Sequence, residues 1–511
     1  MPVQWNTWLV EFKGGLVSNL SPLQQGINAV GSATILQNFE PSLSGGYRKV
    51  AGYEKFIDAE VTGTGTIQGV AVVPGTGSNQ VIVIRDGVYY LGAGGSYTSK
   101  ATASTTTASK VRFARYNFSG TEKIVFVDSN NYPAYYDTDA ETVTFLSSST
   151  VNDEVQGAEH VAFFKNALFL SKGSNVFFTA PFTDDDLEPA SGGGVINVGS
   201  DVTGMIVFRE QLIIFSRDRI TRLAGTTVSD YALQPITEDI GCIQEDTIQE
   251  IGGDVIFMGP DGLRTLSATE RIGDFGLDVA SKPIKTNYES FKDNSSTFSS
   301  LVLRNKAQYR IFGYSPTNRA SVSRGLLATK FVDQGGTGLN WAELRGFKVF
   351  ACDSFIVGDS EFVVFTNDDG YVYRMEFGAS RDGENIDAIY ESPFMPINDP
   401  QMRKTYYKLA LYMEPTGLLG FTASIRLDQN APDVIQPPTI VVETEGSNVF
   451  LYGEPDAVFG TATFGGELNK LYNRNVIGSG KTVAIRIEDI STNPSFTLDT
   501  AVLEYADNDR Q

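Results

Sequence analysis

The stretch Gly253–Ser267, GDVIFMGPDGLRTLS, holds two apolar runs on either side of a tight turn. The first run is Val255–Met258, the turn is Gly259–Gly262, and the second run begins at Leu263. An Asp-Gly pair between apolar runs predicts a β-hairpin, because glycine accepts the positive φ that a tight turn needs. We therefore expect this stretch to form two antiparallel strands.

The same unit recurs along the chain. Val81–Leu91 (VIVIRDGVYYL) and Phe362–Met375 (FVVFTNDDGYVYRM) each carry Asp-Gly at the turn. Related hairpins with other turns are expected at Ile124–Tyr136, Val161–Phe178, Met205–Leu223 and from Tyr309 onward. They follow one another about every 40–50 residues, with longer gaps toward the end, which is the period of a β-propeller with one four-stranded sheet per blade. The sequence predicts an all-β protein with a six- or seven-bladed propeller.

Changes in composition divide the chain into four segments. Residues 1–60 are expected to form an N-terminal arm with the first strands, and residues 61–377 to form the propeller. Residues 378–400 are rich in Gly, Pro and acidic side chains and are expected to be a linker. Residues 401–511 are expected to form a separate β-sandwich, with strands at Tyr406–Met413, Phe421–Leu427, Thr439–Glu443, Val449–Tyr452, Thr482–Glu488 and Phe496–Tyr505.

One of the wider gaps between hairpins contains a helical pattern. It starts at Pro283 and places Ile284, Tyr288 and Phe291 on one face. We expect a short helical insertion at the rim of the propeller.

Composition restricts the possible functions. The 511 residues are 41% apolar, with 40 Lys and Arg against 61 Asp and Glu, for a net charge of −21. This balance argues against tight DNA binding, though not against a wall along which DNA slides. The two cysteines, Cys242 and Cys352, are expected to be buried free thiols. Without a signal-like N-terminus or an apolar run of membrane-spanning length, we expect a soluble protein made in a reducing compartment.

Several stretches resemble known binding or catalytic motifs, but the residues around them do not fit those motifs. Gly478–Thr482 (GSGKT) resembles the end of a phosphate-binding loop, but Asn475 stands where the motif needs glycine, and a strand pattern follows it. The single histidine, His160, is expected to be structural, since a nucleophilic triad or zinc site would depend on it alone. Acidic clusters lack EF-hand spacing and are expected to be solvated loops. No cofactor or metal is expected.

The sequence offers little direct support for sugar chemistry. A carboxylate pair of glycosidase type remains possible, because a propeller brings distant loops together. The Asp-Gly turns lack the Ser-x-Asp-x-Gly-x-x-Trp pattern of sialidase-like propellers. The chain has three Trp for stacking on sugars, although its 22 Tyr could substitute.

Three parts of the chain carry a family resemblance. They are residues 12–26 (FKGGLVSNLSPLQQG) with 33–56 (ATILQNFEPSLSGGYRKVAGYEKF), residues 238–267 (EDIGCIQEDTIQEIGGDVIFMGPDGLRTLS), and the C-terminal stretches KTYYKLALYMEPTG, SGKTVAIRIED and FTLDTAVLEY. With these the chain resembles the tail nozzle proteins of short-tailed bacteriophages, also called packaged-DNA stabilisation or distal tail-tube proteins.

The resemblance implies a structural virion protein without catalytic activity. It implies a homo-hexamer below the adaptor ring of the portal–tail complex, made in the host bacterial cytoplasm and located in the virion tail. The tube would retain packaged double-stranded DNA and pass it during ejection without sequence-specific binding, and tail fibres or spikes would be partners. A negative lumen would repel phosphates and keep the DNA from sticking.

Two further hypotheses remain open from the sequence. A propeller with a β-sandwich is also a common plan for carbohydrate-binding or carbohydrate-cleaving proteins, and fold alone does not decide between them. A host-binding tip or fibre-docking platform of the same virion is the other alternative.

Six residues are candidates for contacts in an assembly. Arg48, Lys49 and Tyr53 combine a basic pair with an aromatic residue near glycine turns, which suits a subunit or adaptor interface. The acidic residues Asp382, Glu384 and Asp387 of the expected linker are candidates to line a channel constriction.

Overall fold

A computed structural model describes residues 5–508 except 76–78, 106–108, 119, 147–151, 226, 228, 273–278, 318–322, 334–335, 418, 444–448, 451–462 and 465–470. Strands dominate this part of the chain, and the α-helices are short: α1 (Pro22–Asn28), α2 (Leu266–Ile272) and α3 (Lys285–Asp293). The all-β expectation is confirmed.

Four sheets of the predicted propeller region each contain four consecutive strands. They are β6 (Gly69–Val72), β7 (Val81–Arg85), β8 (Val88–Ala93) and β9 (Ser96–Thr102); β10 (Arg112–Phe118), β11 (Thr121–Val127), β12 (Ala134–Asp137) and β13 (Thr142–Phe145); β14 (His160–Phe164), β15 (Ala167–Lys172), β16 (Asn175–Phe178) and β17 (Gly194–Asn197); and β18 (Val202–Phe208), β19 (Gln211–Ser216), β20 (Ile220–Ala224) and β21 (Ala232–Thr237). Each is antiparallel, as tight hairpin turns require.

The remaining sheets of this region depart from that pattern. A three-stranded sheet contains β22 (Gln244–Ile251), β23 (Asp254–Gly259) and β24 (Gly262–Thr265). In another, β29 (Ala351–Val357), β30 (Ser360–Thr366) and β31 (Val372–Met375) take their fourth strand from β5 (Tyr53–Lys55). A third group, β25 (Thr297–Leu303), β26 (Gln308–Tyr314), β27 (Arg324–Asp333) and β28 (Gly336–Arg345), belongs to a nine-stranded sheet.

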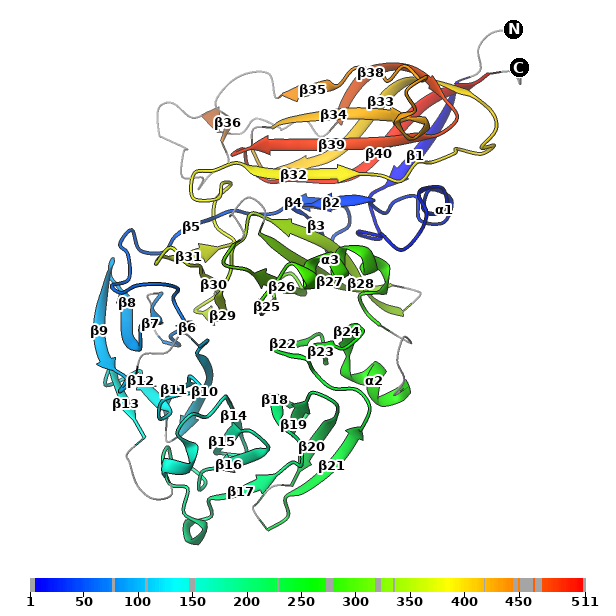
Figure 1. Cartoon of the computed structure of the whole chain (residues 1–511). Coiled ribbons are helices and arrows are strands. Elements are labelled where there is room, and N and C mark those ends of the chain that lie inside the picture. The colour runs from blue at the N-terminus through cyan, green and yellow to red at the C-terminus, as the bar shows by residue number, and fades with distance from the viewer. Residues whose placement is uncertain are drawn as a thin grey trace.

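The first strands of these groups surround a common axis, so the arrangement is propeller-like (Figure 1). Contacts run from β10 to β14, β18, β22, β25, β29 and β6 in turn. The circuit is completed where the Val111 amide donates to the Gln68 carbonyl at 3.0 Å. Apolar clusters fill the spaces between neighbouring sheets, which explains why strands such as β7 are buried along their whole length.

The hairpins predicted from Asp-Gly turns are confirmed. β23 pairs antiparallel with β24 across the turn of the opening stretch. β7 pairs with β8, and at that turn both Asp86 and Gly87 have positive φ, 52° and 74°. The helical insertion is also confirmed, since α3 buries Tyr288 and Phe291.

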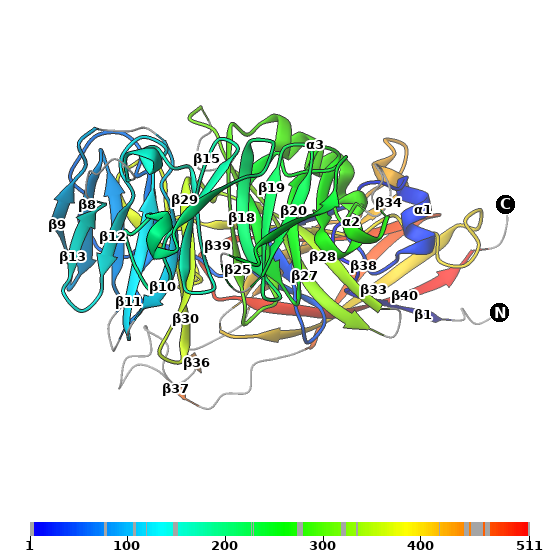
Figure 2. The same cartoon turned by 90° about the horizontal axis from the view of Figure 1, so that it is seen from below.

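Two larger sheets stack above the propeller-like ring (Figures 1 and 2). One continues the nine-stranded sheet through β2 (Ile35–Gln37), β32 (Ile386–Glu391), β39 (Val483–Ser491), β34 (Gly420–Leu427) and β35 (Ile440–Glu443). The other contains β3 (Phe39–Pro41), β4 (Tyr47–Lys49), β40 (Phe496–Asp507), β33 (Lys404–Pro415), β38 (Leu471–Gly480) and β1 (Asn6–Glu11). Side chains of both sheets share one core, and we call this pair the sandwich lobe. A short parallel pair, β36 (Val449–Phe450) and β37 (Thr463–Phe464), lies apart.

The N-terminal segment differs from the expected arm. β1 and β4 pair with β40, whereas β5 pairs with β31 in the ring. β2 lies between β28, to which it is parallel, and β32, to which it is antiparallel. The first strands therefore contribute to both lobes, a long-range pairing that no local sequence pattern reveals.

The segment 378–400 also differs from the expected linker. β32 forms within it and is a central strand of the sandwich lobe, with Ile386, Ala388 and Tyr390 fully buried. The glycines of this segment, Gly378 and Gly383, lie before the strand, and its prolines follow the strand.

A buried group of ion pairs reinforces the junction between the two lobes. The Arg310 guanidinium of β26 is 0% exposed and pairs with Glu40 of β3 at 2.9 Å and with Glu376 at 2.6 Å. Lys306 pairs with the same two carboxylates. Although burial opposes ionisation, the two cations hold the pKa of Glu376 down at about 2.

Candidate functional site

Cavities lie on the axis of the propeller-like ring. The inner strands from several sheets line one cavity of about 320 Å³, and a second cavity of about 680 Å³ adjoins it. Both are lined by Lys110, Arg112, His160, Glu245 and Asp246. These five side chains therefore lie between the two cavities, and we call them the axial cluster.

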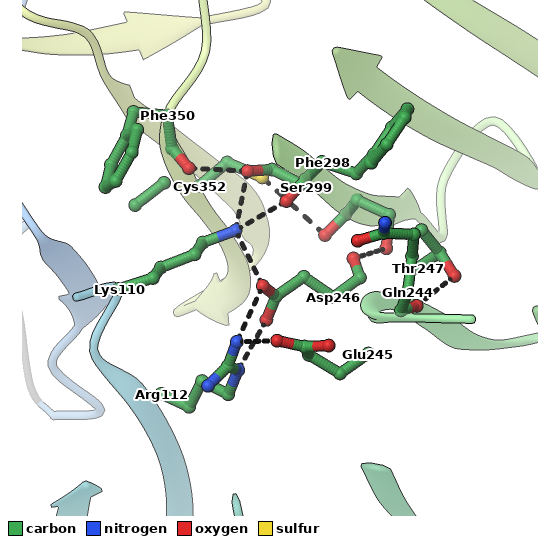
Figure 3. Close-up of polar contacts among 12 residues, drawn as sticks. Lys110, Arg112, Gln244, Glu245, Asp246, Thr247, Phe298, Ser299, Phe350 and Cys352 are labelled. Carbon is green, nitrogen blue, oxygen red and sulfur yellow. Dashed lines mark hydrogen bonds and ion pairs between the residues drawn. The ribbon is translucent and has the colours of Figure 1, made fainter. Parts of the chain in front are cut away.

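Ion pairs of the axial cluster cross the ring (Figure 3). Arg112 of β10 donates from Nε to Asp246 Oδ1 of β22 at 2.9 Å, and it also pairs with Glu245. Lys110 lies 3.3 Å from Asp246 and donates to the Ser299 hydroxyl of β25 at 2.7 Å. Because β10 does not neighbour β22 or β25 around the ring, these contacts join opposite sides of it.

Neighbouring charges keep Asp246 and Arg112 of the axial cluster ionised. Burial opposes charge on Asp246, but Lys110 and Arg112 outweigh it and lower the pKa of that carboxyl to about 2. Burial also opposes the charge of Arg112, but the carboxylates of Asp246 and Glu245 outweigh it and raise the pKa of Arg112. His160 behaves in the opposite way, since burial and the neighbouring Arg112 charge lower its pKa to about 3. At neutral pH His160 is uncharged, as expected of a structural histidine.

A second ion pair lies along the wall of the smaller cavity. Arg115 of β10 pairs with Asp353 of β29, and it also donates to the Val72 carbonyl of β6 at 2.8 Å. Asp353 in turn accepts from the Val72 amide at 2.7 Å. Three sheets meet through this contact, which fixes their spacing near the axis.

The arrangement restricts the chemistry available at the axis. Asp246 is held as a carboxylate, so it can act as a base, a nucleophile or an anchor for a cation, but not as a proton donor at neutral pH. Cys242 and Cys352 are free, and burial raises the pKa of each thiol to about 12, so neither is an activated nucleophile. Among the described residues no group of three or more His, Cys, Asp or Glu could hold a metal ion.

The residues predicted for a subunit interface are engaged within the chain. Lys49 is 1% exposed and pairs with Asp489 at 2.9 Å inside the sandwich lobe, so it is wrong as an interface contact. The Arg48 guanidinium donates to Ser495 Oγ at 3.3 Å. Tyr53 packs against Phe347, Phe365 and Tyr373, and its hydroxyl donates to the Gly346 carbonyl at 3.2 Å.

The residues predicted for a channel constriction lie away from the axis. Asp382 pairs with Lys55 at 3.6 Å, and Asp387 pairs with Arg381 at 3.5 Å, while Glu384 is exposed in the loop before β32. None of the three lines the axial cavities. Their place in a channel formed between copies of the chain stays a prediction.

Sequence reasoning missed most of the axial cluster. The available signal was a pair of charged residues at the start of a predicted strand, as in Lys110-Val111-Arg112 and Glu245-Asp246. That signal alone does not show which strands face one another across a ring.

Comparisons with known proteins give no family. No protein-family model matches the chain, and no curated protein matches it. Solved structures are similar to it in fold. One is the extracellular domain of a hybrid two-component system from B. thetaiotaomicron, 10% identical over 75% of this chain and 46% of that one, with a TM-score of 0.39. Another is an ancestral GH74 enzyme, which is 11% identical over 65% of this chain and 49% of that one, with a TM-score of 0.41.

A further similar structure is that of the exo-β-1,3-galactanase from Phanerochaete chrysosporium with galactose, 10% identical over 89% of this chain and all of that one (100%), with a TM-score of 0.27. The chain spans less than half the length of the first two structures. Two of these similar structures belong to enzymes, in contrast to the expectation that this chain has no catalytic activity. At such low identity the likeness concerns the fold, and no activity is transferred from it.

No helix among the described residues has the length and hydropathy needed to cross a membrane.

Proposed function

We propose that this chain is a structural subunit of the tail of a short-tailed bacteriophage, in which copies assemble as a hexameric nozzle. The nozzle extends the tail channel below the adaptor ring, retains packaged double-stranded DNA and passes it during ejection. The three sequence stretches that resemble nozzle proteins support this proposal. The proposal includes a seven-bladed propeller, with β5 completing the last blade.

The observation that carries the proposal is the union of the two lobes by the N-terminal strands. β2 makes the sheet of β25–β28 continuous with the sandwich lobe, and Glu40 of β3 enters the buried ion group around Arg310. A subunit of a tube that carries DNA under pressure needs two lobes that are joined rigidly, because a flexible joint between them would let the wall of the tube open.

The axial cluster supports one detail of the proposal. Its ion pairs cross the ring, so we place the DNA path between copies of the chain and not through the propeller axis. The net charge of −21 suits a wall along which phosphates move without binding.

Virus particles that lack this protein test the proposal. The retained DNA is measured in the heads, and the tails are imaged in negative stain. We expect heads that package DNA and then lose it, on shortened tails. Full heads on tails of normal length would overturn the nozzle proposal.

The second candidate is a carbohydrate-binding or carbohydrate-cleaving protein. It is favoured by the axial cavity of about 320 Å³, whose lining includes the carboxylates of Glu245, Asp246 and Asp353. Two of the similar solved structures belong to enzymes of that class. Release of reducing sugar from β-glucans or galactans, abolished by Asp246→Asn in a variant that still folds, would move this candidate to the front.

A further inference from the structure

A groove of about 580 Å³ lies on the outer face of the sandwich lobe, remote from the axis. Strands β1, β40, β33 and β38 form its floor, and their inner faces pack in the core. Aromatic, aliphatic and polar side chains line it together.

Two aromatic rings form one end of the groove. Trp5 is 52% exposed and meets Tyr407 edge to face, with ring centroids 3.9 Å apart. The pairing of β33 with both of its neighbours shifts register between Tyr406 and Lys408. This bulge leaves Tyr406 in the core and brings both Tyr407 and Lys408 to the groove.

Four polar side chains form a row across the floor. Thr7 is opposite Glu504, Glu504 is opposite Lys408, and Lys408 is opposite Asn475 in the strand pairing. Since neighbouring strands lie about 4.8 Å apart, the row extends over roughly 14 Å. It supplies hydrogen-bond donors from Lys408 and Asn475 and acceptors from Glu504 and Asn475.

The polar groups of this row keep bonding capacity toward a ligand. Lys408 and Glu504 form an ion pair at 3.9 Å, longer than a hydrogen bond, and their side chains are 35% and 41% exposed. One cation and one anion leave the groove without net charge, whereas the chain as a whole carries −21. An anionic partner is therefore disfavoured, and an uncharged ligand rich in hydroxyl groups is favoured.

We propose that this groove binds a neutral oligosaccharide chain, such as the uncharged part of a cell-surface glycan. The apolar face of a sugar ring stacks on Trp5, and the hydroxyl groups of the following rings bond to the polar row. The exposed Ile477, 73% accessible, borders the groove beside Asn475 and adds apolar contact for the sugar rings. The site is independent of the nozzle proposal and would hold if the chain served elsewhere.

The test measures binding of the full chain to maltohexaose, cellohexaose, laminarihexaose and N-acetylchitohexaose by calorimetry and by tryptophan fluorescence. Trp5 dominates a fluorescence response to surface ligands, because Trp341 is 1% exposed and Trp8 packs against the core. We expect at least one sugar to bind and to shift this fluorescence, at least tenfold weaker binding in Trp5→Ala and in Lys408→Ala, and partial retention in Trp5→Phe.

Phe182→Ala is the matched control, because Phe182 is a 62% exposed aromatic residue outside the sandwich lobe and its loss should leave binding unchanged. Thermal unfolding of each variant verifies folding. Absence of binding to every sugar by the unmodified chain would overturn the proposal. The proposal would also be overturned if the unmodified chain bound no sugar but formed oligomers that Trp5→Ala dissociates in sedimentation velocity. The groove would then be a contact between copies of the chain.

Discussion

Asp246 is the residue on which the axial cluster depends most. Replacement by Asn leaves Lys110 and Arg112 facing each other near the axis without their shared counter-charge. We expect Asp246→Asn to lower the free energy of unfolding by about 3 kcal/mol in a urea titration. Glu141→Gln is the control, because its ion pair with Lys100 involves a half-exposed carboxylate, and a change below about 1 kcal/mol is expected. Equal losses in both variants would contradict a structural role for the cluster.

The lowered pKa of His160 predicts that the stability of the folded chain depends on pH. Its pKa is about 3 in the folded chain against 6.5 for an unperturbed histidine, so the unfolded chain binds the proton more readily. Stability is therefore complete above pH 6.5 and falls as the pH decreases from there toward 3. His160→Gln should flatten this slope between pH 6.5 and 5, where most carboxylates do not yet titrate, and denaturant midpoints at each pH measure it. An unchanged slope would show that His160 titrates normally in the folded chain.

Lys49 and Asp489 form a buried pair between the two sheets of the sandwich lobe, each side chain 1% exposed. Lys49→Met alone leaves a buried carboxylate without its counter-charge and should cost about 3–5 kcal/mol of unfolding free energy. Adding Asp489→Leu removes that charge and should recover much of the loss. The two single variants and the double variant form a thermodynamic cycle in urea, and strictly additive losses would contradict direct coupling.

β2 is the strand that joins the propeller-like ring to the sandwich lobe, because it pairs with β28 and with β32. Leu36, 1% exposed at its centre, contacts the shared core, and Leu36→Ala should cost about 2–4 kcal/mol. Because β2 pairs with strands of both lobes, hydrogen exchange should increase together in peptides from β23 and β39. Leu43→Ala, at a 56% exposed residue, is the control and should change stability by less than about 0.5 kcal/mol. Faster exchange confined to β39 would mean that the lobes unfold separately.

The sequence was informative where structure is local. Asp-Gly turns located the hairpins of β7–β8, β23–β24 and β30–β31, and helical spacing located α3. It failed where pairing is long-range: β1 joins β40 across nearly the whole chain, and β2 joins strands more than three hundred residues away. A strand of three residues such as β2 carries too few positions to show a period.

The candidate sites were missed for the same reason. Lys110 and Asp246 approach only because their strands face across a ring, and Trp5 meets Tyr407 only through the pairing of β1, β40 and β33. The interface prediction for Lys49 failed because a basic pair beside an aromatic residue looks the same whether it is exposed or lies in a core with an acidic partner.

At the scale of the whole molecule, two lobes joined by shared strands form a body suited to the wall of an assembly. The axial cluster joins opposite sides of one lobe, and the groove containing Trp5 lies on the outer face of the other. The nozzle proposal and the glycan-binding proposal therefore concern different surfaces of one subunit.

The most direct test of the nozzle proposal is an electron cryo-microscopy reconstruction of the tail of the source virus. We expect six copies of this fold around the tail axis, below the adaptor ring, with the DNA path between copies and none through the propeller. A tail in which no density fits this fold would contradict the account, and so would DNA density along the axis between Lys110 and Asp246.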